Sequence, residues 1–286
     1  MKQRPSFPAR LDATLAKTRP NPHGAMATGP APVAKPALKT VSSPAPAKAA
    51  LPPVARAKAP SPLPQVPQGH GMDSQAVRQR MVQKLAGQGV TDRLVLGAMG
   101  AIERHRFVDS ALVNQAYEDT SLPIGLGQTI SKPGVVSRMI ELLRNGATGR
   151  LGRVLEIGTG CGYQAAVLSL VADEVYSIER LRGLHEKARE NLRHLRLANV
   201  HLLFGDGMAG YAKGAPYAAI IAAAGGEAVP QAWVDQLAVG GRLVAPVVTS
   251  GPGGGQALLV LDKTPQGVRQ TLLEAVHFVP LKSGVA

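Results

Sequence analysis

The sequence predicts an α/β fold with a doubly wound, mostly parallel sheet, antiparallel strands at its C-terminal end and helices at its N-terminal end. Three observations predict this fold. From Arg153 onward, short apolar runs alternate with helical stretches, which is typical of a parallel sheet covered on both faces. A glycine-rich turn follows the first of these runs, and the last two apolar runs have no helix between them.

Composition divides the chain into two parts. Residues 1–72 contain fifteen of the 23 prolines, and ten Lys or Arg residues against one acid, so they carry nine of the thirteen net positive charges. Such a segment cannot bury enough apolar surface to offset the entropy lost on ordering. We therefore expect a disordered, basic Pro/Ala/Lys-rich extension over residues 1–72 and one folded domain over residues 73–286.

The sequence argues against membrane, secreted and disulfide-bonded classes. No run of 18 apolar residues is present, and the N-terminus lacks the apolar core of a secretory signal. The single Cys161 excludes an intramolecular disulfide and a cysteine-cluster metal site. We expect a cytoplasmic protein without a metal and without a membrane partner.

The basic extension raises the question of a nucleic-acid partner. Basic segments bind nucleic acid or acidic surfaces through charge alone. Phe7 is the only aromatic residue of this extension, so stacking on bases has little to use. We expect at most non-specific contacts by this segment, and a solubilising extension is the favoured interpretation.

Three helices are expected before the sheet. Residues 74–85 carry an amphipathic stripe, with Asp73 or Ser74 as the cap. A second helix opens at Thr91-Asp92 and runs through Ala101-Ile102, and a third begins after Pro133 and stops at Asn145-Gly146.

The expected strands are short, apolar and spaced for crossover helices. They span residues 154–157, 175–179, 200–204, 219–224 and 242–248. Residues 163–171 and 181–197, between the first three strands, are long enough for helices. The runs at 257–262 and 272–281 are expected as antiparallel strands, whereas the pattern does not predict the strand order at the far edge.

A glycine turn after the first strand carries the strongest chemical signal. Gly158, Gly160 and Gly162 stand just before a helix, where a tight turn lets a ligand approach the backbone at the strand ends. Dinucleotide sites need G-x-G-x-x-G, and Tyr163 occupies the place of the last glycine. The observed E-x-G-x-G-x-G, which starts at Glu156, resembles the first motif of class I S-adenosylmethionine methyltransferases.

Two acids follow the next two strands. Glu179 ends the second strand, where a carboxylate can accept hydrogen bonds from both ribose hydroxyls. Asp206-Gly207 follows the third strand, where a carboxylate can reach an adenine amino group. Taken singly, these residues also fit a solvated carboxylate and a simple turn. Three signals on three successive strand ends favour one bound cofactor, S-adenosyl-L-methionine.

The stretch upstream of the sheet identifies a family resemblance. Residues 117–133 read YEDTSLPIGLGQTISKP and resemble the signature of protein-L-isoaspartate O-methyltransferases, which have a Rossmann-like class I methyltransferase fold. Further matches follow in family order at residues 154–168, 179–180, 199–211, 215–217, 229–247 and 276–281. The resemblance covers essentially all of residues 73–286, and the extension lies outside it.

The resemblance implies methyl transfer from S-adenosyl-L-methionine to the α-carboxylate of L-isoaspartyl residues in damaged proteins and peptides. The ester then closes to a succinimide, and its hydrolysis returns some normal aspartate. A carboxylate is already ionised at neutral pH, so no general base is needed and catalysis rests on alignment in a water-poor site. Isoaspartyl proteins and peptides are the expected partners, and we expect a monomer.

The resemblance also assigns site residues. Ser131 is the expected catalytic residue, holding the substrate carboxylate by a hydrogen bond; the other interpretation is a helix cap before Lys132-Pro133. The residues expected to bind the cofactor are Gln128, Thr129, Ile130, Ser131, Glu156, Gly158, Gly160, Gly162, Glu179, Arg180, Asp206 and Gly207.

Two departures from the family pattern concern the substrate side. Ala218 stands where an Asp is usual, and Gly225-Gly226 stand where Ala and Pro are commoner. Ala218 leaves open the alternative of a cofactor-binding protein with weakened activity. The basic extension leaves open a second alternative, a class I methyltransferase with another substrate such as RNA. The RNA alternative lacks an N/D-P-P-Y-type motif, because residues 222–226 read AAAGG.

Overall fold

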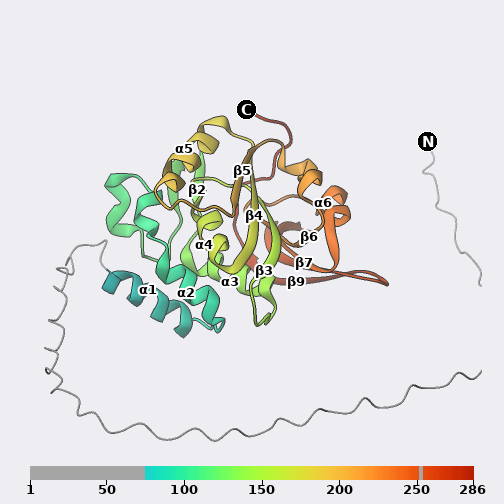
Figure 1. The fold of residues 1–286 in the computed structure, drawn as a ribbon, viewed down its shortest axis with the longest axis horizontal. Helices are drawn as coiled ribbons and strands as arrows, with labels where there is room; N and C mark the ends of the chain where they lie inside the picture. The colour runs from blue at the N-terminus through green and yellow to red at the C-terminus, as the bar shows by residue number, and fades with distance from the viewer. Residues whose placement is uncertain (1–74, 251–253) are drawn as a thin grey trace, which may run out of the picture. The chain divides into compact units, whose positions relative to one another are not determined.

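The computed structural model describes residues 75–250 and 254–286, so the expected extension 1–72 and the expected first-helix cap lie outside the described residues. A seven-stranded sheet forms the centre of the described part (Figure 1). Its strands are β3 (Leu151–Ile157), β4 (Ala172–Glu179), β5 (Val200–Phe204), β6 (Tyr217–Ala222), β7 (Leu237–Thr249), β8 (Gly255–Thr264) and β9 (Gly267–Val276).

The strand order is β5-β4-β3-β6-β7-β8-β9. Strands β3 to β7 pair in parallel, whereas β8 and β9 pair antiparallel. The chain winds outward from β3 to β5 and then returns to β6 on the other side of β3. The predicted doubly wound, mostly parallel sheet with antiparallel C-terminal strands is confirmed, and β9 is found at the far edge.

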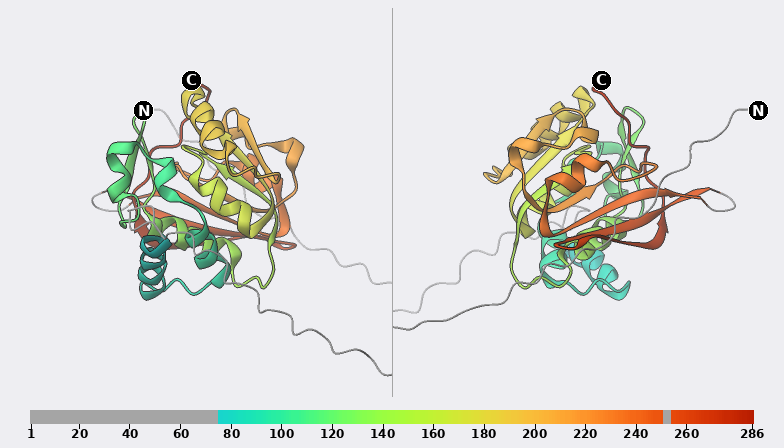
Figure 2. Two further views of the ribbon diagram at one scale, coloured as in Figure 1. Left: turned by 60° about the vertical axis from the view of Figure 1, so that its left-hand side comes forward. Right: turned by 90° about the vertical axis from the view of Figure 1, so that its right-hand side faces the viewer.

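Helices cover both faces of the sheet. The helices are α1 (Gln75–Gly87), α2 (Arg93–Ala101), α3 (Pro133–Arg144), α4 (Tyr163–Val171), α5 (Arg182–Arg193) and α6 (Gln231–Gln236). Along β3, Val154 belongs to the buried cluster shared with α1 to α5, and Leu155 belongs to the cluster that contains Trp233 of α6. This alternation follows from the two-residue period of a strand. Figure 2 shows the elements from two further sides.

The ends of α2 and α3 agree with their sequence signals, whereas α5 ends before the expected position. Asp92 caps α2, its side chain accepting hydrogen bonds from the N–H groups of Leu94 and Val95. Asn145 ends α3 in the left-handed conformation that terminates many helices. The helix expected over 181–197 ends earlier, at Arg193, and Arg196 has a positive φ of 47°, which a continuing helix does not allow.

The strand expected over 272–281 is corrected by the structure. Strand β9 starts earlier, at Gly267, and ends at Val276. Its first six residues are exposed, so pairing with β8 defines the strand where no apolar pattern marks it. Beyond the strand, the backbone N–H of Phe278 donates to Oε1 of Gln256 (2.7 Å) instead of joining the sheet ladder.

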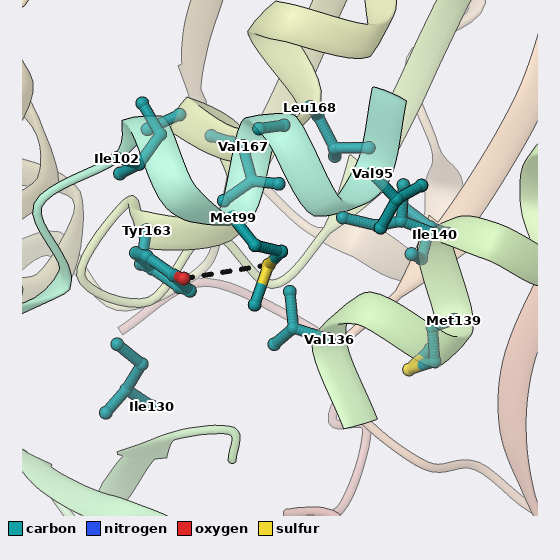
Figure 3. Packing of buried hydrophobic residues seen from close by; sticks show 14 of the residues in the cluster. Val95, Met99, Ile102, Ile130, Val136, Met139, Ile140, Tyr163, Val167 and Leu168 are labelled. Carbon is teal, nitrogen blue, oxygen red and sulfur yellow. Dashed lines mark hydrogen bonds between the residues drawn. The ribbon is translucent and has the colours of Figure 1, made fainter. Parts of the chain in front are cut away.

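A small hairpin precedes α3, and the apolar pattern did not predict it. Strands β1 (Leu122–Gly125) and β2 (Gln128–Ile130) pair antiparallel and form a separate two-stranded sheet. Ile130, at the end of β2, is buried in the cluster that also holds Val136 of α3 and Tyr163 of α4 (Figure 3). The hairpin is therefore anchored in the main core at its C-terminal end.

Candidate active site

A cavity of about 440 Å³ opens at the carboxyl ends of β3, β4 and β6. This is the point where the strand order reverses, and ligands of open α/β sheets bind there. Its lining comes mainly from the β1–β2 hairpin, the turn after β3, the end of β4, the loop after β6 (Ala223 and Ala224) and the segment 279–282. Of the twelve residues expected to bind the cofactor, all except Glu156, Gly162 and Asp206 line this cavity.

The glycine turn has the backbone that its sequence requires. Gly158, Gly160 and Gly162 have φ values of 90°, 57° and 91°, in the region that side chains rarely adopt. A Cβ at Gly160 would lie 3.2 Å from Ile124 Cδ1, across the cavity wall. A Cβ at Gly162 would lie 3.1 Å from Leu192 Cδ1, so this glycine allows close packing on α5 behind the cavity.

Glu179 is buried at the end of β4 and faces the cavity. Its Oε2 accepts a hydrogen bond from the N–H of Gly160 (2.9 Å), and its Oε1 accepts one from the N–H of Leu181 (2.9 Å). An ionised carboxylate has about four acceptor positions. Two remain after these bonds, which suits a ligand that presents two hydroxyl groups.

Glu156 lies behind the glycine turn and is fully buried. Ser177 Oγ hydrogen-bonds to Glu156 Oε2, and the Ser177 and Thr159 hydroxyls lie 2.6 Å apart. Burial raises the pKa of Glu156 to about 8, although the hydrogen bond from Ser177 opposes the shift. The carboxyl group thus belongs to a buried polar chain that reaches the turn through Thr159.

Asp206 joins the end of β5 to the C-terminal residues. Its Oδ1 accepts from the N–H of Met208 (2.8 Å), and its Oδ2 accepts from the N–H of Gly284 (2.7 Å). Arg180 Nε donates to the Gly284 carbonyl (2.9 Å), and the backbone of Ala286 pairs with Arg180 and Arg182. The chain end therefore crosses the strand ends from β5 to β4.

The sequence did not predict that the segment 279–282 forms a wall of the cavity. Leu281 and Lys282 of this segment line the cavity, and the residues that follow them cross the ends of β5 and β4. The apolar pattern carries no signal for a segment held by backbone hydrogen bonds. The match of residues 276–281 to the family was the available signal, but it did not indicate a place in the site.

The β1–β2 hairpin lies over the cavity. Its tip turns through three residues of positive φ, Gly125, Leu126 and Gly127. Lys187 Nζ of α5 donates to the Ile124 carbonyl (3.0 Å), and a Cβ at Gly183 would lie 3.2 Å from Leu126 Cδ1. These contacts attach the hairpin to α5 across the cavity.

Ser131 stands where this cavity meets a second one. The second cavity, of about 410 Å³, is lined by Ser131, Lys132, Ala223 and the segment 275–279, among others. Ser131 is half-buried and lines both spaces. The interpretation of Ser131 as a helix cap is wrong, because α3 begins at Pro133 with Lys132 at the cap position and no side-chain cap bond.

One departure from the family pattern has a local explanation. A Cβ at Gly225 would collide with the side-chain amide of Gln256, whose Oε1 is held by the N–H of Phe278. The Gly225 N–H donates to the Val279 carbonyl (2.9 Å), and the Leu281 N–H donates to the Gly225 carbonyl (2.7 Å). The loop after β6 thus holds the segment that lines both cavities. Nothing in the structure explains Ala218.

Three further observations concern Cys161, metal sites and membrane-spanning helices. Burial raises the pKa of the Cys161 thiol to about 11, so the thiol carries little charge near neutral pH. Within residues 75–250 and 254–286, no group of three or more His, Cys, Asp or Glu side chains is placed to hold a metal ion. In the same part of the chain, no helix is long and apolar enough to cross a membrane.

The sequence of this chain matches a known protein family and is similar to known proteins of that description. Residues 76–286 match the family described as protein-L-isoaspartate(D-aspartate) O-methyltransferase. A protein-L-isoaspartate O-methyltransferase of Methylibium petroleiphilum is 60% identical over 220 residues, covering 76% of this chain and 81% of that protein. One of Leptothrix cholodnii is 59% identical over 220 residues, covering 76% of this chain and 77% of that protein.

Solved structures extend the likeness to three dimensions. A protein-L-isoaspartate O-methyltransferase structure is 28% identical with a TM-score of 0.65, covering 73% of this chain and 67% of that one. A Plasmodium falciparum structure of the same description, in complex with S-adenosyl-L-homocysteine, is 23% identical with a TM-score of 0.63 and shares the fold. It covers 72% of this chain and 98% of that one. The chain therefore belongs to the protein-L-isoaspartate O-methyltransferase family.

Proposed function

We propose that this chain transfers a methyl group from S-adenosyl-L-methionine to the α-carboxylate of L-isoaspartyl residues in damaged proteins and peptides. The observation that carries the proposal is the place of Ser131, at the junction of the cavity of the glycine turn and the second cavity. A cofactor in the first cavity and a peptide carboxylate in the second would meet beside its hydroxyl. Family membership supports the same reaction.

The cofactor cavity suits an adenosyl group bound through its ribose. The two free acceptor positions of Glu179 would take the two ribose hydroxyls. Gly158 and Gly160 would lie against the methionine part, and Gln128 to Ser131 would cover it from the hairpin. Arg180 lines the cavity beside Glu179 and holds the chain end.

Four other residues expected to bind the cofactor would act at the edge of the cavity or from behind the glycine turn. Gly207 lines the cavity, and Asp206 would accept from the adenine amino group with a lone pair left free by its two backbone bonds. Glu156 and Gly162 would support the glycine turn through Thr159 and through packing on α5.

The reaction requires little proton transfer by the protein. When bound, S-adenosyl-L-methionine supplies a methyl group on a positively charged sulfur. The ionised substrate carboxylate would form the new C–O bond as the C–S bond of the bound donor breaks, with the electron pair left on sulfur. Ser131 donates a hydrogen bond that aligns the carboxylate, and apolar walls that include Ile130, Ile157 and Ile178 keep water out.

Several finer properties form part of the proposal. The chain acts as a monomer in the cytoplasm, uses no metal, and has isoaspartyl proteins and peptides as its partners. The basic segment 1–72 makes at most non-specific contacts with nucleic acid, since its charge is concentrated without aromatic residues to stack on bases.

The test is to incubate the protein with methyl-labelled S-adenosyl-L-methionine and a matched pair of peptides that differ only in Asp or isoAsp. Label should enter the isoAsp peptide and not its partner. Mild base should release that label as methanol, because the product is a carboxyl methyl ester. A base-stable label, or equal labelling of both peptides, would overturn the assignment.

A further inference from the structure

The first turn of α3 is capped from a distant loop. Pro133 has no N–H, and the N–H of Val135 is bonded to the Lys132 carbonyl. The remaining N–H of this turn, that of Gly134, donates to Asp119 Oδ1 (2.7 Å). Asp119 therefore does the work of a cap, although fifteen residues separate it from its partner.

The loop that carries Asp119 is itself held in place. Arg104 is fully buried, and its Nε donates to the Ala116 carbonyl (2.7 Å). Gly134 fits closely under the Asp119 carboxylate: a Cβ at Gly134 would lie 2.9 Å from Oδ1 and 3.0 Å from Oδ2. A side chain at Gly134 and the present position of Asp119 are therefore incompatible.

The Asp119–Gly134 bond closes the base of the hairpin that covers the active-site cavity. Asp119 precedes β1, and Gly134 follows β2 by four residues. Ser131 lies inside this closed segment, between the buried anchor Ile130 and the start of α3. Within the described residues, the Ser131 hydroxyl is not used as the cap of the helix that it precedes.

We propose that Asp119 is a positioning residue for methyl transfer: by capping α3 itself, it leaves the Ser131 hydroxyl free for the substrate carboxylate. Serine next to an uncapped helix start is a strong competitor for the cap position. Without the Asp119 carboxylate, the Ser131 hydroxyl turns to the open N–H of Gly134 and away from the substrate. This inference rests on the proposed role of Ser131.

The test is a double-mutant cycle of Asp119→Ala and Ser131→Ala, measured as kcat on an isoAsp peptide. We expect Asp119→Ala to lower kcat by about tenfold, with affinity for S-adenosyl-L-homocysteine changed less than about twofold. The double variant should be no slower than Ser131→Ala alone, because both changes remove one alignment. Asp119→Asn should restore most of the rate, since its amide oxygen can accept from Gly134.

A second variant tests whether a loss of kcat in Asp119→Ala comes only from misfolding. Gly134→Ala keeps the Asp119 carboxylate but pushes it away, and alanine favours the helix; it should reproduce the loss of kcat and its coupling to Ser131→Ala. Glu118→Ala, which removes an exposed neighbouring acid, is the matched control and should leave kcat unchanged.

The possible results distinguish a failure of this inference from a failure of the proposed function. The inference would be overturned if the losses of kcat in Asp119→Ala and Ser131→Ala multiplied in the double variant. It would also be overturned if both Asp119→Ala and Gly134→Ala had an unchanged kcat. In either case the wild-type protein would still methylate the isoAsp peptide. A wild-type protein that does not methylate the isoAsp peptide would remove the proposed function itself.

Discussion

The two halves of the cavity are built in different ways. On the cofactor side, one continuous segment, residues 154–163, supplies the strand, the glycine turn and the start of a helix, and Glu179 of the neighbouring strand braces it. On the substrate side, Ser131 lies where the hairpin, the residue Ala223 after β6 and the segment 275–279 meet. The glycine turn of the first half is local in sequence, although the hairpin and the segment 279–282 also line that cavity, whereas the second half is assembled from distant segments alone.

This difference separates binding from alignment. The cofactor side contributes backbone shape and one buried carboxylate, so substitutions there should change the affinity for the cofactor. The substrate side contributes the placement of one hydroxyl, so substitutions there should change the rate at saturating substrate. Mutations on the two sides should therefore separate the two kinds of effect.

The largest expected effect is on the cofactor side. Glu179→Ala removes the acceptor for two ribose hydroxyls and the brace of the glycine turn, so affinity for S-adenosyl-L-homocysteine should fall by roughly 2–3 kcal/mol, about 30- to 150-fold. Isothermal titration calorimetry measures it. Glu174→Ala changes a half-buried acid on the same strand that does not line the cavity; it is the control and should bind normally. Unchanged affinity in Glu179→Ala would place the ribose elsewhere.

On the substrate side, Ser131→Ala should lower kcat by about 10- to 100-fold, because one alignment bond of about 1.5–3 kcal/mol is lost. Calorimetry should show nearly unchanged cofactor affinity, since the expected contacts of Gln128 to Ser131 are mainly through backbone. Ser131→Thr retains the hydroxyl and should recover part of the rate. If Ser131→Ala lost much of its cofactor affinity but kept its kcat, Ser131 would serve cofactor binding and not substrate alignment.

The same contrast explains how much the sequence could predict. Periodicity located the parallel strands and most helices, because buried strands and amphipathic helices leave an apolar pattern. The glycine turn and Glu179 were predicted because strand ends and glycines are local signals. Strand β9 was placed too late, because its first residues are exposed and only pairing with β8 defines them.

Features that depend on tertiary contacts were beyond the pattern. The chain end bonds to the side chains of Asp206 and Arg180 through its own backbone groups, which any sequence supplies. The cap of α3 was sought at Ser131, the nearest capping residue, whereas the structure uses Asp119 from a loop fifteen residues away. Gly162 and Glu156 were grouped with the cofactor residues by motif, although they lie behind the turn.

The smallest expected effect comes from the N-terminal segment. The matched family covers residues 76–286, and neither half of the cavity is lined by residues before 121. A chain that begins at Asp73 should therefore keep the melting temperature, the cofactor affinity and the activity of the full chain. Thermal unfolding and the peptide assay measure this. Loss of more than about 2 kcal/mol of stability on trimming would contradict the predicted boundary.

The central claim is that the substrate side aligns a carboxylate that is already charged and performs no proton transfer. The pH dependence of the single-turnover rate, at saturating isoAsp peptide and S-adenosyl-L-methionine, tests this most directly. The rate should change by less than about twofold between about pH 6 and pH 7.5, because the substrate carboxylate titrates far below this range. A rate that rises tenfold per pH unit through a group titrating near pH 7 would show a general base at work and contradict the account.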